Sequence, residues 1–347
     1  MSKGDLLGLI KNEVNGRIYH TSISSQLRLG GRSYPRAGEY LLEVDEYPLD
    51  EVYLIIITAA NEGLGKVSWR VGIEELSITR EFKPQVVVEC GGYLYAVHLF
   101  DLSKVVKGGK TYTLTISCDS PHPITIDGVE LVGVKRDSGL ITEVDYRGGC
   151  ILINQTENYA VQYSSKYDGR VSTSILLNMP SKNAKVDIVL NERVVKTLNN
   201  YIGLINTVIN SFESLGNSTL SIYHRDSGAK YHPPFIPIYS ILRYKVNKEG
   251  PKISIVVSDV RRKGNNISIT ATLRNEGDLV CDTLTLIALS GGNLFIRDVI
   301  RSLKPGEELS KSYDVDAKKA NKLMVLRAIY KGLHGQEVSE VKTQLPS

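Results

Sequence analysis

Few residues in this sequence have the types and spacing that catalysis needs. None of the six histidines lies in an HExxH pattern, and no serine lies in a GxSxG segment. Gly108-Gly109-Lys110-Thr111 ends like a phosphate-binding loop, GxxxxGK[ST], but the position of that loop's first glycine holds Lys104. A predicted strand also follows this segment, whereas a phosphate loop leads into a helix. We therefore interpret the segment as a turn, and the sequence indicates no catalytic site.

Five carboxylates gather around one predicted turn: Glu43, Asp45, Glu46, Asp50 and Glu51. Such oxygens could hold a structural calcium ion, but their spacing matches no EF-hand loop, and a solvated acidic turn is the favoured interpretation. No CxxC pair and no histidine pair has zinc-site spacing. The sequence therefore predicts no cofactor, with structural calcium as the open alternative.

Tyrosine dominates the aromatic residues, with 19 Tyr against 5 Phe and 1 Trp. Tyrosine offers apolar area with a polar tip, which suits contact surfaces as well as ordinary strands. Two predicted strands each carry a pair of tyrosines, and two histidines lie in the equivalent turns SPHP and YHPP. The candidate contacts for a glycan or a protein partner are Tyr93, Tyr95, His122, Tyr159, Tyr163 and His232.

The four cysteines are Cys90, Cys118, Cys150 and Cys281. If Tyr93–Phe100 and Thr111–Cys118 pair as a hairpin, Cys118 lies near Tyr93 and within reach of Cys90. A Cys90–Cys118 disulfide is then geometrically feasible, and buried free thiols are the alternative.

Composition is that of a globular protein, with 42% hydrophobic and 23% charged residues. The net charge of +4 is spread along the chain, and its densest basic cluster, Arg261-Arg262-Lys263, is too small for a nucleic-acid footprint. No segment has the length of a transmembrane helix, and the opening apolar run is too short for a signal peptide. We expect a cytoplasmic protein if the chain is complete as written.

Alternation of apolar and polar residues predicts strands through most of the chain. In residues 111–118, Tyr112, Leu114 and Ile116 share one face and threonines share the other, so one face is buried. Asp101 is placed to cap a short turn before this strand, and Gly108 and Gly109 are placed to end it. Residues 17–135 contain about nine such strands, among which EVYLIIITAA is apolar on both faces and is expected to be central.

Residues 138–248 repeat this pattern at a constant offset. Val52 aligns with Val171, and Ile56 aligns with Ile175. Residues 201–224 are expected to repeat the order of helical turn, glycine stop and strand. Seven further predicted strands follow the polar linker Asn247–Lys252.

We therefore predict an all-β protein with domains at 1–137, 138–248 and 249–347. The first two are expected to be jelly-roll-like β-sandwiches in tandem, and the third a seven-stranded immunoglobulin-like sandwich.

Three segments of the third domain, ATLRNEGD, SLKPGEELSKSYDV and LMVLRAIYKG, resemble adhesion-related (CARDB-type) immunoglobulin-like domains of bacterial and archaeal surfaces. The upstream segments Asp101–Gly109 and Asp127–Leu131 resemble the tandem β-sandwich modules of archaeal surface proteins. The resemblance implies a non-enzymatic structural or adhesive protein, at the cell surface or outside it, that binds protein partners or itself. The alternative is a carbohydrate-binding protein that uses the tandem sandwiches. A glycosidase or protease whose site is built from loops is a third hypothesis.

Overall fold

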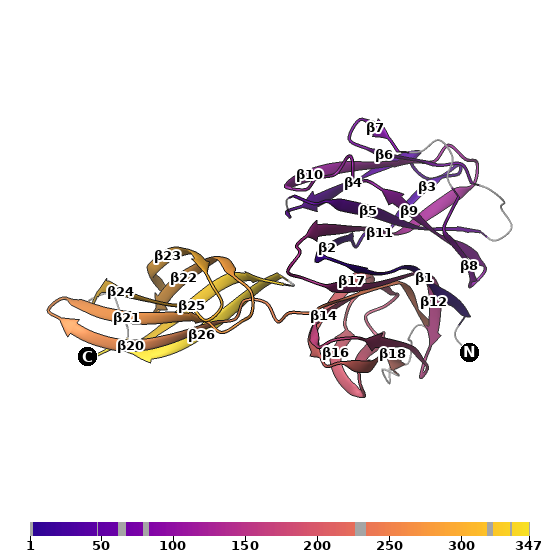
Figure 1. Ribbon diagram of the computed structural model, residues 1–347. Helices are drawn as coiled ribbons and strands as arrows, with labels where there is room; N and C mark the ends of the chain where they lie inside the picture. Colours follow the sequence, from indigo (N-terminus) through magenta and orange to yellow (C-terminus); the bar gives the residue numbers. More distant parts are fainter. Residues whose placement is uncertain are drawn as a thin grey trace. The chain divides into compact units, whose positions relative to one another are not determined.

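The computed structural model describes residues 3–46, 48–61, 67–78, 83–225, 234–317, 322–333 and 335–346, and only the backbone of Lys3 and Lys263. Every regular element within these ranges is a β-strand, and all pairings are antiparallel, so the all-β prediction is confirmed (Figure 1). The chain divides into two compact units, Met1–Asn247 and Lys248–Ser347. Each unit is described separately below.

The first sandwich of the N-terminal unit packs a six-stranded sheet against a four-stranded sheet. The larger sheet has the order β2 (Gly16–Ile23), β11 (Pro123–Arg136), β5 (Glu51–Asn61), β9 (Tyr93–Asp101) and β8 (Val86–Cys90), with β3 (Leu27–Gly30) also on β11. The smaller has the order β4 (Ala37–Val44), β10 (Lys110–Ser117), β6 (Arg70–Ile73) and β7 (Leu76–Ser77). As predicted, Tyr112, Leu114 and Ile116 of β10 face the core, and β5 lies inside the larger sheet.

The second sandwich repeats this strand order. Its larger sheet has the order β1 (Lys3–Val14), β12 (Thr142–Asn154), β19 (Phe235–Val246), β14 (Gly169–Met179) and β17 (Gly203–Glu213). Its smaller sheet has the order β13 (Asn158–Ser165), β18 (Gly216–Arg225), β15 (Lys185–Leu190) and β16 (Arg193–Asn199). The strand order β12-β19-β14-β17 therefore matches the order β2-β11-β5-β9. The aligned residues Ile56 and Ile175 lie in the cores of the first and the second sandwich, respectively.

Strand β1 belongs to the second sandwich, although the sequence division placed residues 3–14 in the first domain. It pairs with β12 from Lys3↔Leu152 to Val14↔Thr142, while the next strand, β2, pairs with β11. Figure 1 shows β1, in indigo, beside β12. The chain thus contributes β1 to the second sandwich, then forms the first sandwich, and then returns to complete the second.

The outer faces of the two larger sheets pack against each other. At Gly128 of β11 the backbone approaches Leu176 so closely that a Cβ would lie 2.6 Å from its Cδ2. The carboxylate of Glu130 is buried in this interface, accepts a hydrogen bond from the Tyr146 hydroxyl at 2.5 Å and lies 3.1 Å from Nε2 of His20. Since buried polar groups need partners, this network favours one register of the two sheets.

The predicted hairpin between Tyr93–Phe100 and Thr111–Cys118 does not form. Strand β9 pairs with β5 and β8, whereas β10 pairs with β4 and β6 in the opposite sheet. The predicted turn between them crosses the sandwich: Asp101 accepts the Ser103 N–H at 2.9 Å, and the Val106 N–H donates to Leu102. Gly108 and Gly109 end the turn with φ of 87° and 73°, as predicted.

The C-terminal unit is a seven-stranded sandwich. One sheet has the order β20 (Ile253–Lys263), β21 (Asn266–Asn275) and β24 (Glu308–Asp316). The other has the order β23 (Asn293–Leu303), β22 (Cys281–Ser290), β25 (Leu323–Gly332) and β26 (Gly335–Gln344). The buried amide of Asn275 binds the carbonyls of Leu279 and Leu303, which explains the sequence motif at this turn. The resemblance of this unit to adhesion-related domains stays a prediction.

Candidate functional site

The predicted contact residues lie in several separate places. Tyr93 is exposed at the β8–β9 turn, and His122 is exposed between β10 and β11. Tyr95 is mostly buried between the two sandwiches, with its ring 5.9 Å from that of Tyr239. His232 lies outside the described residues. These residues do not form one site.

Tyr159 and Tyr163 are different, because they share the inner face of β13. Tyr159 is half-buried and Tyr163 is buried at 6% exposure, and both pack towards the core of the second sandwich. Strand β13 is the edge strand of its sheet, as β1 is of the opposite sheet. The two tyrosines therefore line one edge of this sandwich.

The sheet opposite these tyrosines carries a group of charged residues on its inner face. In the register of β12 with β19, Glu143 lies opposite Lys245 and Asp145 lies opposite Arg243. Directly opposed residues of neighbouring strands point to the same face, so each acid has a basic neighbour. We call this group, with Tyr159 and Tyr163, the inner charged patch; its charged members are Glu143, Asp145, Arg147, Glu213, Arg243 and Lys245.

Two ion pairs flank Tyr163. The Arg147 guanidinium lies 2.9 Å from Asp145, and the Arg243 guanidinium lies 2.7 Å from Glu213. Both arginines also lie near the Tyr163 ring, with Cζ 5.7 Å and 4.5 Å from its centroid. These distances are in the cation–π range, so the ring and both guanidiniums hold each other in place.

Exposure divides the patch into an outer and an inner layer. The side chains of Arg147 and Asp145 are 27% and 13% exposed, whereas those of Arg243 and Glu213 are 5% and 6% exposed. Burial raises the pKa of Tyr159 and of Tyr163, so both phenols stay protonated at neutral pH. The outer layer is Tyr159 with Arg147 and Asp145, and the inner layer is Tyr163 with Arg243 and Glu213.

The inner layer retains hydrogen-bonding capacity. Among the described residues, the Tyr163 hydroxyl, Nε of Arg243 and Oε1 of Glu213 have no hydrogen-bond partner. All three residues are more than nine-tenths buried. Buried polar atoms of this kind are uncommon in folded proteins.

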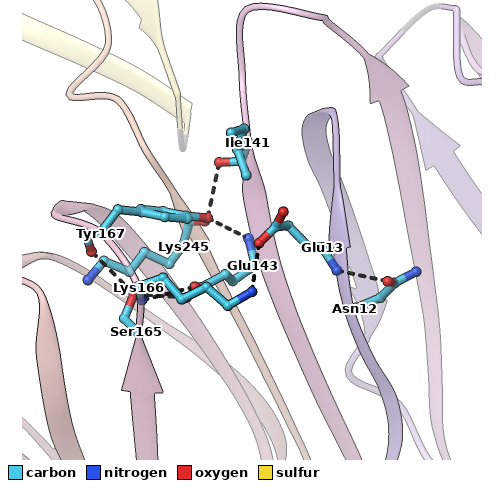
Figure 2. Close-up of polar contacts among 8 residues, drawn as sticks. All are labelled: Asn12, Glu13, Ile141, Glu143, Ser165, Lys166, Tyr167 and Lys245. Carbon is cyan, nitrogen blue, oxygen red and sulfur yellow. Dashed lines mark hydrogen bonds and ion pairs between the residues drawn. The ribbon is translucent and has the colours of Figure 1, made fainter.

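One end of the patch is closed by polar contacts between three segments (Figure 2). The Tyr167 hydroxyl accepts the Glu143 N–H at 2.9 Å and lies 3.1 Å and 3.2 Å from the carbonyl oxygens of Lys245 and Ile141. The Glu143 carboxylate accepts the Ser165 hydroxyl at 2.8 Å. This end ties β12, β19 and the segment after β13 together.

Sequence reasoning found the two tyrosines but missed the charges opposite them. Alternate charges in TEVDYRGG and LRYKV were the available signal. In a strand with alternating residues, the charged face is normally taken to be exposed to solvent. Here both faces of β12 are covered, because its apolar face packs on the other sandwich and its charged face points into its own sandwich.

The remaining candidates give no second site. Among the described residues, no three His, Cys, Asp or Glu side chains gather to hold a metal ion. In the acidic turn, Glu46 pairs with Lys135 at 2.7 Å and Glu51 pairs with Arg136 at 3.0 Å. A cavity of about 220 Å³ between the two larger sheets is lined mainly by valine, isoleucine and leucine. The described residues contain no helix that is long and apolar enough to span a membrane.

All four cysteines are buried, and no disulfide joins any two of them in this structure. Cys118 lies in the core of the first sandwich, where its Sγ is 3.9 Å from the carbonyl of His122. Cys90 ends β8 and faces β1 and β12. The pairing of Cys90 with Cys118 depended on the β9–β10 hairpin, which is absent.

No family model matches this chain, and no curated protein matches it. Solved structures give distant matches to glycoside hydrolases. A GH2 beta-galacturonidase from Eisenbergiella tayi is 14% identical, with a TM-score of 0.21 over 53% of this chain and 34% of that chain. Bifidobacterium dentium beta-glucuronidase is 9% identical, with a TM-score of 0.24 over 59% and 39%. Bacteroides uniformis beta-glucuronidase is 12% identical, with a TM-score of 0.22 over 58% and 26%. This chain thus spans well under half the length of these enzymes.

These matches correct the leading functional prediction. A structural or adhesive surface protein was expected, but the matched structures are carbohydrate-active enzymes.

Proposed function

We propose that this protein binds carbohydrate without cleaving it, through the outer layer of the inner charged patch. The observation that best supports the proposal is the arrangement of side chains around Tyr159, at one edge of the second sandwich. There a half-buried aromatic ring lies beside the Arg147–Asp145 ion pair, in which Nε and Oδ1 are 2.9 Å apart. Sugars offer an apolar ring face together with hydroxyls that donate and accept. A tyrosine ring can cover that face, while Asp145 accepts from hydroxyls and Arg147 donates to them.

Charge balance indicates a neutral sugar. The patch has three acids, Glu143, Asp145 and Glu213, and three bases, Arg147, Arg243 and Lys245. An anionic ligand would need a surplus of positive charge to offset its loss of hydration. We therefore expect neutral pyranose oligosaccharides to bind more tightly than oligosaccharides of uronic acids.

The test is calorimetric titration of the full chain with neutral oligosaccharides selected on a glycan array. Tyr159→Ala should weaken binding at least about tenfold, since loss of one stacking surface is worth roughly 1.4 kcal/mol or more. Tyr93→Ala is the matched control, because Tyr93 is an exposed strand tyrosine far from the patch in sequence and on another sandwich.

Two results would reject the proposal: an array without hits for the wild type, or equal affinities of Tyr159→Ala and Tyr93→Ala for the selected glycan. Non-catalytic binding is checked separately. Bound oligosaccharide should be recovered intact after prolonged incubation, and released monosaccharide would show hydrolysis instead.

A further inference from the structure

The two cysteines that face each other lie on different sandwiches. Cys90 is the last residue of β8, and Cys150 lies in β12, opposite Asp5 of β1. They are 3% and 0% exposed. Cys150 follows Cys90 by sixty positions, and strands β9, β10 and β11 of the first sandwich lie between them in sequence. This juxtaposition is independent of the carbohydrate site.

Close contacts place the Cys90 sulfur on the β1–β12 pair. A Cβ added to Gly4 would lie 2.7 Å from Sγ of Cys90 and 2.1 Å from the carbonyl oxygen of Cys150. The Cys90 sulfur and the Cys150 backbone are therefore within about 5 Å of each other, which is the scale of disulfide geometry. Any residue larger than glycine at position 4 would push the Cys90 sulfur away.

Contacts on either side of the pair fix the same alignment of β8 with β12. A Cβ on Gly149 would lie 3.3 Å from Cγ2 of Val88, and a Cβ on Gly91 would lie 3.1 Å from Cδ1 of Leu152. Cys90 is thus held between two contacts that flank Cys150. In agreement, hydrogen bonding to Cys90 is the largest cause that raises the pKa of the Cys150 thiol, followed by burial.

We propose that Cys90 and Cys150 form a disulfide under oxidising conditions and so link the two sandwiches covalently. With glutathione disulfide as oxidant, the Cys90 thiolate attacks one glutathione sulfur, and one glutathione thiolate leaves. The Cys150 thiolate then attacks Sγ of Cys90, the mixed disulfide breaks, and the second glutathione leaves. The protein loses two electrons and two protons, and one glutathione disulfide becomes two glutathione thiols.

The bond would fasten the edge strand β8. Within the part of the chain that the structure describes, this strand pairs with β9 alone, and no ladder partner lies on its other backbone edge. A covalent tie to β12 would resist peeling of β8 from the sheet and separation of the two larger sheets.

The test refolds the full chain from urea in a glutathione redox buffer, so that access to buried thiols does not limit the reaction. Free thiols are then counted under denaturing conditions, and disulfide-linked peptides are mapped by mass spectrometry. We expect the count to fall from four to two, with one linked peptide pair that contains Cys90 and Cys150. The urea midpoint of the oxidised wild type should exceed that of its reduced form.

Variants separate this pairing from the others. Cys118→Ser and Cys281→Ser should keep the link and its effect on the urea midpoint, and Cys90→Ser should lose both. Four remaining thiols in the wild type, or a linked peptide pair that contains Cys118, would overturn the proposal.

Discussion

Asp127 and His98 are expected to change stability with pH in opposite directions. Asp127 is 2% exposed at a bulge of β11, where Gln26 donates to its carboxylate, and burial raises its pKa to about 6. His98 is 4% exposed, lies 3.3 Å from the Thr58 hydroxyl, and burial lowers its pKa to about 4. Asp127→Asn removes the first effect and leaves the second.

The magnitudes follow from the difference between folded and unfolded pKa values, at roughly 1.4 kcal/mol for a difference of one. Asp127 has a raised pKa, so its contribution is present below the ordinary value of 3.8 and is lost as pH rises through about 6. That contribution is about 3 kcal/mol. His98 has a lowered pKa, so its contribution, also about 3 kcal/mol, is present above 6.5 and is lost as pH falls through about 4. In the wild type the two nearly cancel.

The measurement is urea unfolding, followed by the fluorescence of the single tryptophan, Trp69, whose ring lies 4.9 Å from that of His98. The free energy of unfolding of the wild type minus that of Asp127→Asn should rise by about 2.4 kcal/mol between about pH 7 and about pH 4, and towards about 3 kcal/mol below that. Other titrating groups are common to both proteins and drop out of this difference.

Asp119→Asn is the matched control, because Asp119 is exposed in the same sandwich and should show no comparable trend. A wild-type minus Asp127→Asn difference that stays constant with pH would refute the reasoning, since it would mean that Asp127 titrates alike in the folded and unfolded chains.

Three further changes test the packing around the fold and the patch. Gly108 and Gly92 have nearly the same φ, 87° and 83°. A Cβ added to Gly108 would lie 1.8 Å from the Glu46 carbonyl oxygen, whereas a Cβ added to Gly92 would meet nothing within 4 Å. Gly108→Ala and Gly92→Ala therefore differ mainly in this clash. Thermal unfolding should show a loss of about 1 kcal/mol for Gly92→Ala and several times that for Gly108→Ala, and equal losses would contradict the clash. Glu213→Ala leaves the Arg243 charge buried without its partner and should lower the free energy of unfolding by about 3–5 kcal/mol. Tyr167→Phe removes the hydroxyl that joins β12 to β19 and should cost about 1–3 kcal/mol in urea unfolding, and an unchanged midpoint would show that this contact adds nothing.

Alternation in the sequence predicted which face of a strand is buried but not which strand it pairs with. The inward residues of β10 were predicted correctly, yet β10 was paired with β9 because the two are adjacent in sequence. Partner choice depends on the turn Asp101–Gly109, which leads the chain across to the opposite sheet. A short turn with a cap and a glycine stop fits a hairpin and a crossover equally well.

Residues 203–213 show a second limit. A helical turn was expected there by analogy with the segment before Gly108 and Gly109, but the residues form strand β17, although Leu204, Ile205, Val208 and Ile209 have helix-like spacing. As an edge strand it has apolar residues on both faces, and Val208 and Phe212 are 43% and 53% exposed. The β-branched residues favour an extended conformation. Because this edge strand is only partly covered, the spacing of its apolar residues gives little information about which element it packs against.

The charged residues of the inner charged patch could not be predicted from the sequence, for a related reason. The sequence can show that Asp145 and Arg147 alternate with Val144 and Tyr146, but it cannot show that both sides of β12 are covered. That depends on the packing of one sandwich on the other, through residues more than a hundred positions apart, such as Tyr95 of β9 and Tyr239 of β19.

The pairing of β1 with β12 has a consequence for synthesis of the chain. Val14 cannot pair until Thr142 has been synthesised, and Lys3 cannot pair until Leu152 has been synthesised. Roughly 130 to 150 residues are therefore made before strand β1 can pair. At a ribosomal rate of about 5–20 residues per second, that delay is about 7 to 30 seconds. Throughout this time the nascent chain carries an unpaired strand, and the first sandwich can close only near its end, once β11 (Pro123–Arg136) has been made. This interval is when a chaperone would be needed, and when two growing chains on one messenger could exchange their first strands.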